Sequence, residues 1–266
     1  MNIFLHELKS RQITTAVWLI AMVVFITLSM AKYQTLSASG LATFKQLAAQ
    51  FPRTIQTIFG MDGLDPTIAG EYYGICFLLI AVLLAIHAGL TGSSVISSDE
   101  EDRVTEFLYS KPRSRTYILT AKWLAGAAIV LAMWGTAVCT SIITISKFAK
   151  FDNFWSDFWL LMIAGLSIQV LFFSVGVTTA ATTSRLGMSA RLVSIAVFSS
   201  YVLYVLERLS DMFSWARYLS VFSYFDAASI IRAHAVNPRT VILCASVSVC
   251  LFIFGYVRFK QRDLRS

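Results

Sequence analysis

The residue types that catalyse reactions form no recognisable catalytic motif in this sequence. His6 and Glu7 begin like the zinc-binding pattern HExxH, but Ser10 stands where the second histidine would be. The phosphate-binding patterns GxxxxGKS and GxxxxGKT do not occur, so the chain lacks the usual cradle for hydrolysing ATP. Serines and histidines are too scattered to pair a nucleophile with a base. The sequence therefore predicts a protein that is not an enzyme.

Two polar side chains, His87 and Gln169, lie inside long apolar stretches. A polar or ionisable residue within a membrane span is a candidate for a transport pathway. The alternative is that each side chain is neutral and satisfied by a neighbouring helix. Small residues near His87 also favour close helix approach, either within one chain or between two copies. These small residues are Ala85, Gly89 and Gly92.

Acids and bases concentrate in one stretch, SSDEEDRVTEFLYSKPRSRTYILTAK, at positions 97–122. Ser98 followed by Glu101 is a capping-box pattern, which favours a helix start. An apolar stripe follows at helical spacing, formed by Val104, Phe107 and Leu108. Pro112 then ends the helix. We expect a short amphipathic helix over 99–110, which is either a solvated loop that fixes the topology or a docking element for a soluble partner.

The elements around this stretch are apolar. The chain of 266 residues is 57% hydrophobic and 14% charged, with a mean hydropathy of +0.68, and a soluble domain would need more polar surface. Six runs approach or exceed the roughly 20 residues that a helix needs to cross a bilayer. They cover residues 13–30, 72–96, 117–146, 158–183, 188–206 and 239–257. Because the runs are continuous rather than alternating, we expect an all-α polytopic protein with a single transmembrane domain.

Charge sets the expected orientation. With both termini in the cytoplasm, the inside segments are denser in lysine and arginine, and the loop 97–116 is cytoplasmic. The net charge of +7 would also suit nucleic acid, but cytoplasmic loops supply the same excess, so we expect no nucleic-acid binding. The four cysteines lie in apolar runs without metal-ligand spacing, which indicates buried thiols.

Two segments outside the spans have patterns of their own. Residues 1–12 predict a helix at the inner membrane interface, with Glu7 and Arg11 away from its apolar face. That face is formed by Ile3, Phe4 and Leu8. Residues 207–238 are rich in aromatic and charged side chains and predict an outer, re-entrant segment. Its first arginine, Arg208, is explained by pairing at the membrane interface or by snorkelling. Its aromatic residues are candidates for gating the outer mouth or for anchoring at the interface, among them Phe222, Tyr224 and Phe225.

The charged stretch resembles the first cytoplasmic loop of ATP-binding-cassette (ABC) transporter permeases of the type-two export family. That family's pattern is a pair of acids, a Gly-Thr, an acid, two leucine-like residues, a Pro, a Ser-Arg and a Lys that opens the next span. The matching positions are Glu100, Glu101, Val104, Thr105, Glu106, Phe107, Leu108, Pro112, Ser114, Arg115 and Lys122. Val104 departs from the family's glycine. The ending FKQRDLRS and the segment YLSVFSYFDAASII also resemble this family, so the similarity extends along the whole chain.

The resemblance implies a permease subunit whose coupling helix, at 99–110, sits in a groove of a separate nucleotide-binding ATPase. The chain itself would bind no cofactor, since ATP and Mg²⁺ belong to the ATPase. It would pair with a second copy or a paralogue in the plasma (inner) membrane of a bacterium. The implied cargo is a hydrophobic or amphipathic molecule such as a peptide antibiotic, a drug or a lipid, moved outward.

Two other classes of function stay open. One is a secondary transporter or channel that works without an ATPase, and the other is a membrane scaffold or assembly factor. Flux through liposomes that hold only this protein would favour the first. A non-ATPase partner without any flux would favour the second. A secondary transporter more often carries several acids at the midplane of the membrane, and their scarcity here favours an external motor.

Overall fold

The computed structural model of the chain describes residues 3–40, 46, 50–101, 115–148, 154–183 and 186–261. The six long helices are α2 (Gln12–Ser39), α5 (Ala69–Glu101), α7 (Arg115–Phe148), α8 (Trp155–Thr182), α9 (Leu186–Leu209) and α12 (Pro238–Gln261). The short ones are α1 (Ile3–Ser10), α4 (Arg53–Ile58), the 3-10 helix η1 (Asp211–Tyr218), α10 (Val221–Tyr224) and α11 (Ala227–Ala233). No strand occurs among the described residues, which confirms the all-α class.

Each long helix is long and apolar enough to cross a membrane, and the six correspond to the six predicted apolar runs. Most of them extend beyond the predicted edges. The helix α7, for example, has 34 residues and is therefore about 51 Å long, whereas the hydrocarbon core is roughly 30 Å thick. A helix of this length extends beyond the hydrocarbon, where polar residues can continue it without entering lipid.

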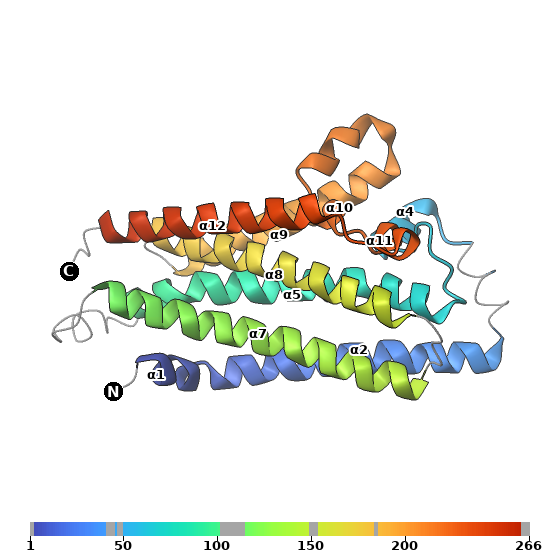
Figure 1. Cartoon of the computed structure of the whole chain (residues 1–266), viewed down its shortest axis with the longest axis horizontal. Helices are drawn as coiled ribbons and strands as arrows, with labels where there is room; N and C mark the ends of the chain where they lie inside the picture. The colour runs from blue at the N-terminus through green and yellow to red at the C-terminus, as the bar shows by residue number, and fades with distance from the viewer. Residues whose placement is uncertain are drawn as a thin grey trace.

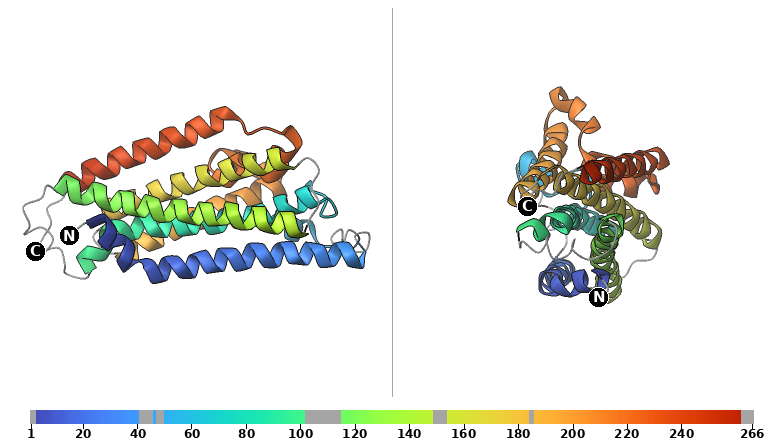
Figure 2. Two further views of the ribbon diagram at one scale, coloured as in Figure 1. Left: turned by 60° about the horizontal axis from the view of Figure 1, so that its bottom comes forward. Right: turned by 90° about the vertical axis from the view of Figure 1, so that its left-hand side faces the viewer.

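The long helices run side by side along one axis, and α1 lies at the same end of the bundle as the last turns of α12 (Figure 1). We call this the terminal end and the opposite one the distal end. The helix α5 finishes at the terminal end and α7 starts there, so both flank the predicted coupling loop beside α1 (Figure 2). The short elements α4, α10 and α11 gather at the distal end.

The bundle is built around α5 and α8. About two thirds of each of these spans is buried (67% of the most apolar window), against 17% for α2 and 22% for α12, whose apolar side chains face outward. The two central helices cross at glycines with no side chain between their backbones. A Cβ atom added to Gly92 would lie 3.2 Å from the Cα of Gly176, and Gly89 packs at the same crossing. The small residues noted in the sequence therefore serve packing within one chain.

The structure corrects the predicted start of the coupling helix. The helix α5 continues through Ser97 and Ser98 to Glu101, so Ser98 is not the N-cap of a new helix. A capping box favours a start only where the preceding chain is not already helical, and no glycine or proline separates Gly92 from Glu101. Residues 102–114, where the rest of that helix is expected, lie outside the described residues.

The distal segment after α9 consists of short helices rather than a span. Asp226 caps α11 by accepting a hydrogen bond from the backbone N–H of Ser229 at 2.8 Å. The helix η1 projects sideways from the bundle in Figure 1 and in the right-hand view of Figure 2. Its Trp215 and Tyr218 are exposed. This segment therefore adds width at the distal end and does not cross the bundle.

Candidate functional site

A group of polar residues joins three helices at the terminal end, next to both flanks of the predicted coupling loop. We call it the terminal-end cluster, formed by Glu7, Arg11, Ser94, Val95 and Lys122. Glu7 comes from α1, and Arg11 sits at the joint between α1 and α2. The last turns of α5 supply Ser94 and Val95, and the first turns of α7 supply Lys122.

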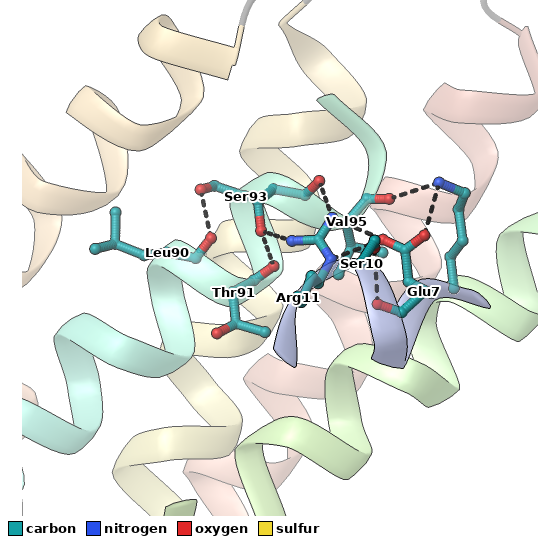
Figure 3. Close-up of polar contacts among 9 residues, drawn as sticks. Glu7, Ser10, Arg11, Leu90, Thr91, Ser93 and Val95 are labelled. Atoms are coloured by element: carbon teal, nitrogen blue, oxygen red, sulfur yellow. Dashed lines mark hydrogen bonds and ion pairs between the residues drawn. The ribbon is translucent and has the colours of Figure 1, made fainter. Parts of the chain in front are cut away.

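The carboxylate of Glu7 lies at the centre of this cluster. Its Oε1 accepts a hydrogen bond from Nε of Arg11 at 2.7 Å (Figure 3). Its Oε2 pairs with Nζ of Lys122 at 3.4 Å. Glu7 is 6% exposed and Lys122 is 4% exposed, so both charges are shielded from water. Such a pair persists only because each charge finds its counterpart in place.

The side chains of Arg11 and Lys122 also donate hydrogen bonds to α5. Nη2 of Arg11 donates to the backbone carbonyl of Ser94 at 2.8 Å, and Nη1 donates to the Ser94 hydroxyl. Nζ of Lys122 donates to the carbonyl of Val95 at 3.4 Å. One buried carboxylate thus fixes α1, α5 and α7 to one another. These contacts make the cluster a rigid joint between the three helices.

The sequence pattern did not reveal this joint. Glu7 was expected on the polar side of an interfacial helix, but it is the one buried residue of α1, while Leu5 is 59% exposed. Two signals were available. Glu7 and Arg11 stand at i, i+4 spacing, which suits an ion pair on one helix face. Lys122 lies inside an apolar segment, where a lysine needs a counter-charge.

The predicted ATPase-coupling residues fall in two groups. Glu100 and Glu101 form the end of α5, and Arg115 opens α7, so the backbone of all three is at the terminal end. The others lie outside the described residues, namely Val104, Thr105, Glu106, Phe107, Leu108 and Pro112. The role of the whole set in coupling stays a prediction.

The five predicted pathway residues do not converge on one site. Phe222 and Phe225 line the same small cavity at the distal end. Tyr224 is not among its lining residues, and its hydroxyl donates to the backbone carbonyl of Tyr218 at 2.8 Å. His87 packs edge-on against the ring of Trp18, with ring centroids 5.5 Å apart. Gln169 lies elsewhere in the core and donates weakly to a carbonyl of α7.

Two of the predicted pathway residues, His87 and Gln169, each carry a buried atom without a hydrogen-bond partner in the described part of the chain. These atoms are Nδ1 of His87 and Oε1 of Gln169. The amide of Gln169 makes one long contact, from Nε2 to the carbonyl of Val130 at 3.4 Å. An unsatisfied buried acceptor costs roughly 1–3 kcal/mol. The unpartnered atoms of these two residues therefore lower the stability of the core.

We expect the Gln169→Leu substitution to raise the free energy of unfolding by about 1 kcal/mol, because leucine has a similar volume and no orphan oxygen. Titration with SDS in mixed micelles measures this change. Gln169→Glu is the control, since it places a charge at the same site and must lower stability. A fall in stability for the leucine variant would show that the amide has a partner. Loss of transport with increased stability would place Gln169 in the pathway.

Comparison with protein families gives one match. The model of the family described as "ABC-2 family transporter protein" matches residues 1–264. The matched range takes in α1, all six long helices and the distal segment. No curated protein matches the chain.

Proposed function

Because this chain belongs to the ABC-2 transporter family, we propose that it is the permease subunit of an exporter powered by a separate ATPase. The ATPase binds the coupling loop between α5 and α7, and ATP-driven closure moves the spans between inward-facing and outward-facing states. The terminal-end cluster carries the proposal, because it lies where a force on that loop would enter the bundle. ATP and Mg²⁺ bind to the ATPase subunit.

A loop transmits force only if the helices on both sides of it are held rigidly. Glu7 and Lys122 link α1 to α7, and Lys122 also contacts the carbonyl of Val95 in α5. A displacement of the loop therefore moves α1, α5 and α7 together. Without these contacts it would only unwind the ends of α5 and α7. The helix α5 in turn packs on α8 through the glycine crossing, which extends the rigid unit into the centre of the bundle.

The remaining parts of the proposal follow from the family and from the sequence. The chain pairs with a second copy or a paralogue, resides in the plasma (inner) membrane of a bacterium and has both termini in the cytoplasm. Its cargo is hydrophobic or amphipathic. The outward-facing apolar side chains of α2, α9 and α12 suit contact with lipid.

Replacing Phe107 and Leu108 with aspartate tests the coupling. We expect the double variant to insert normally and to lose cargo transport by at least tenfold, because two charges replace the apolar stripe that docks on the ATPase. The measurement is ATP-dependent flux in liposomes that contain the permease and the ATPase that co-purifies with it. Ser110→Asp, which adds a charge off the stripe, should transport normally. Undiminished transport by the double variant, or flux without any ATPase, would contradict the proposal.

A further inference from the structure

A buried carboxylate lies at the distal end, where α11 begins. Asp226 is 6% exposed, and neutral donors hold it from two sides. The backbone N–H and the hydroxyl of Ser229 donate to its Oδ2 at 2.8 and 2.7 Å. The hydroxyl of Tyr204, on α9, donates to its Oδ1 at 3.1 Å. The position of the carboxylate is thus fixed by groups other than its counter-ion.

The counter-ion is the chain's own Arg208, and its fit is incomplete. Nη2 of Arg208 lies 2.6 Å from Oδ2 of Asp226, and its guanidinium carbon lies 5.1 Å from the centroid of the Tyr204 ring. Nε of Arg208 is buried and has no hydrogen-bond partner among the described residues. A buried donor left without an acceptor costs free energy that a better-fitting cation would not incur. Arg208 is therefore a replaceable occupant of the site.

The carboxylate and the aromatic ring border a cavity. Its volume is about 10 Å³, which is room for roughly one water molecule. Asp226 and Tyr204 are its polar lining, and Phe77, Phe222 and Phe225 supply aromatic walls. A carboxylate beside aromatic faces is the combination that recognises an organic cation, through an ion pair and cation–π attraction.

We propose that Asp226 and the aromatic rings around it form a binding site for a monovalent organic cation, and that this ligand displaces Arg208. The exchange replaces one positive charge by another, so the buried carboxylate never loses its counter-charge. Arg208 is the penultimate residue of α9, and 22% of its side chain is exposed, so it can swing into water at the distal rim. The inference rests on the proposed function only in treating this cation as cargo.

Displacement has a structural consequence for the distal segment. The Arg208–Asp226 pair ties the end of α9 to the start of α11, next to the cavity. A ligand that takes the place of Arg208 breaks this tie and contacts the carboxylate instead. Occupancy of the site is therefore linked to release of the segment that carries Phe222 and Phe225.

Binding of dansylcadaverine, a fluorescent cation whose primary ammonium is no larger than the guanidinium that it would displace, to the full-length permease in phosphatidylcholine nanodiscs tests the proposal. No ATPase is present, so failure of the coupling proposal does not affect the result. Fluorescence anisotropy gives the Kd. We expect Asp226→Asn to weaken binding at least tenfold and Arg208→Gln to strengthen it about tenfold, because the internal competitor is removed. The neutral fluorophore N-phenyl-1-naphthylamine should bind all variants alike.

Arg217→Gln is the matched control, since Arg217 is an exposed arginine on the neighbouring η1, and its Kd should equal that of the unmodified protein. If Asp226→Asn fails to fold, Arg208→Gln still decides, because misfolding does not tighten binding. Unchanged or weaker dansylcadaverine binding by a folded Arg208→Gln variant would overturn the proposal and leave the ion pair a structural one. Equal binding by a folded Asp226→Asn variant would overturn it as well.

Discussion

The Gly176→Val variant should lose at least about 3 kcal/mol of unfolding free energy, the top of the range for an overpacked core. A Cβ atom at Gly176 would overlap the backbone carbonyl of Gly89 and lie 2.8 Å from the backbone nitrogen of Ser93. Backbone atoms in a helix cannot move aside as the tip of a flexible side chain can. The helices α5 and α8 would therefore have to separate along their whole contact.

SDS titration of the purified protein measures this loss, and the chain offers a matched control. Gly135 lies within α7, and a Cβ atom added there would meet nothing within 4 Å. Gly135→Val carries the same helix-propensity change without the contact, so its stability should stay within about 0.5 kcal/mol of the original. Equal stability of the two variants would mean that α5 and α8 do not cross as closely as described.

The Glu7→Gln variant should lose about 3–5 kcal/mol of unfolding free energy, because it removes the carboxylate that neutralises Lys122 and Arg11 in a buried position. Breaking one side of a buried ion pair costs more than removing both sides, since the remaining charge stays shielded from water. The same SDS titration measures the change. In the proposed transporter, this variant should also lose ATP-driven flux.

A second substitution separates charge from shape. Adding Lys122→Met to Glu7→Gln should restore stability relative to the single variant, because the buried ammonium is then removed. Lys9→Gln, at an exposed position of the same helix, should leave stability unchanged. If Lys122→Met lowered the free energy of unfolding by the same amount in the Glu7→Gln variant as in the unmodified protein, the two side chains would not be coupled.

The all-α class and the six spans could be predicted from the sequence because length and apolarity are local properties of a segment. The terminal-end cluster could not, since Glu7, Val95 and Lys122 come from three separate segments and neither charge identifies its partner in another segment. Only the fold brings them together. The same reason explains why the sequence left both pairing and snorkelling open for Arg208, which pairs with Asp226 at 2.6 Å.

Local sequence patterns were poor guides where the surrounding structure determines the conformation. The capping box at Ser98 is a genuine helix-start pattern, yet α5 is already helical when it reaches that residue and continues to Glu101. The aromatic residues of the distal segment looked alike in the sequence, but their side chains have different surroundings. Phe222 and Phe225 line a cavity, whereas the hydroxyl of Tyr224 donates a hydrogen bond to the backbone carbonyl of Tyr218. Each side chain's direction depends on the short helices that carry it.

The sideways projection of η1 makes the described part of the molecule wider there than at the terminal end (Figure 1). With the long helices along the membrane normal, the cross-section is larger at one surface of the bilayer than at the other. The protein therefore occupies a larger area in one leaflet than in the other. Trp215 and Tyr218, which are 52% and 75% exposed, supply rings suited to the headgroup layer on the wider side. Lateral pressure in that leaflet consequently acts on η1.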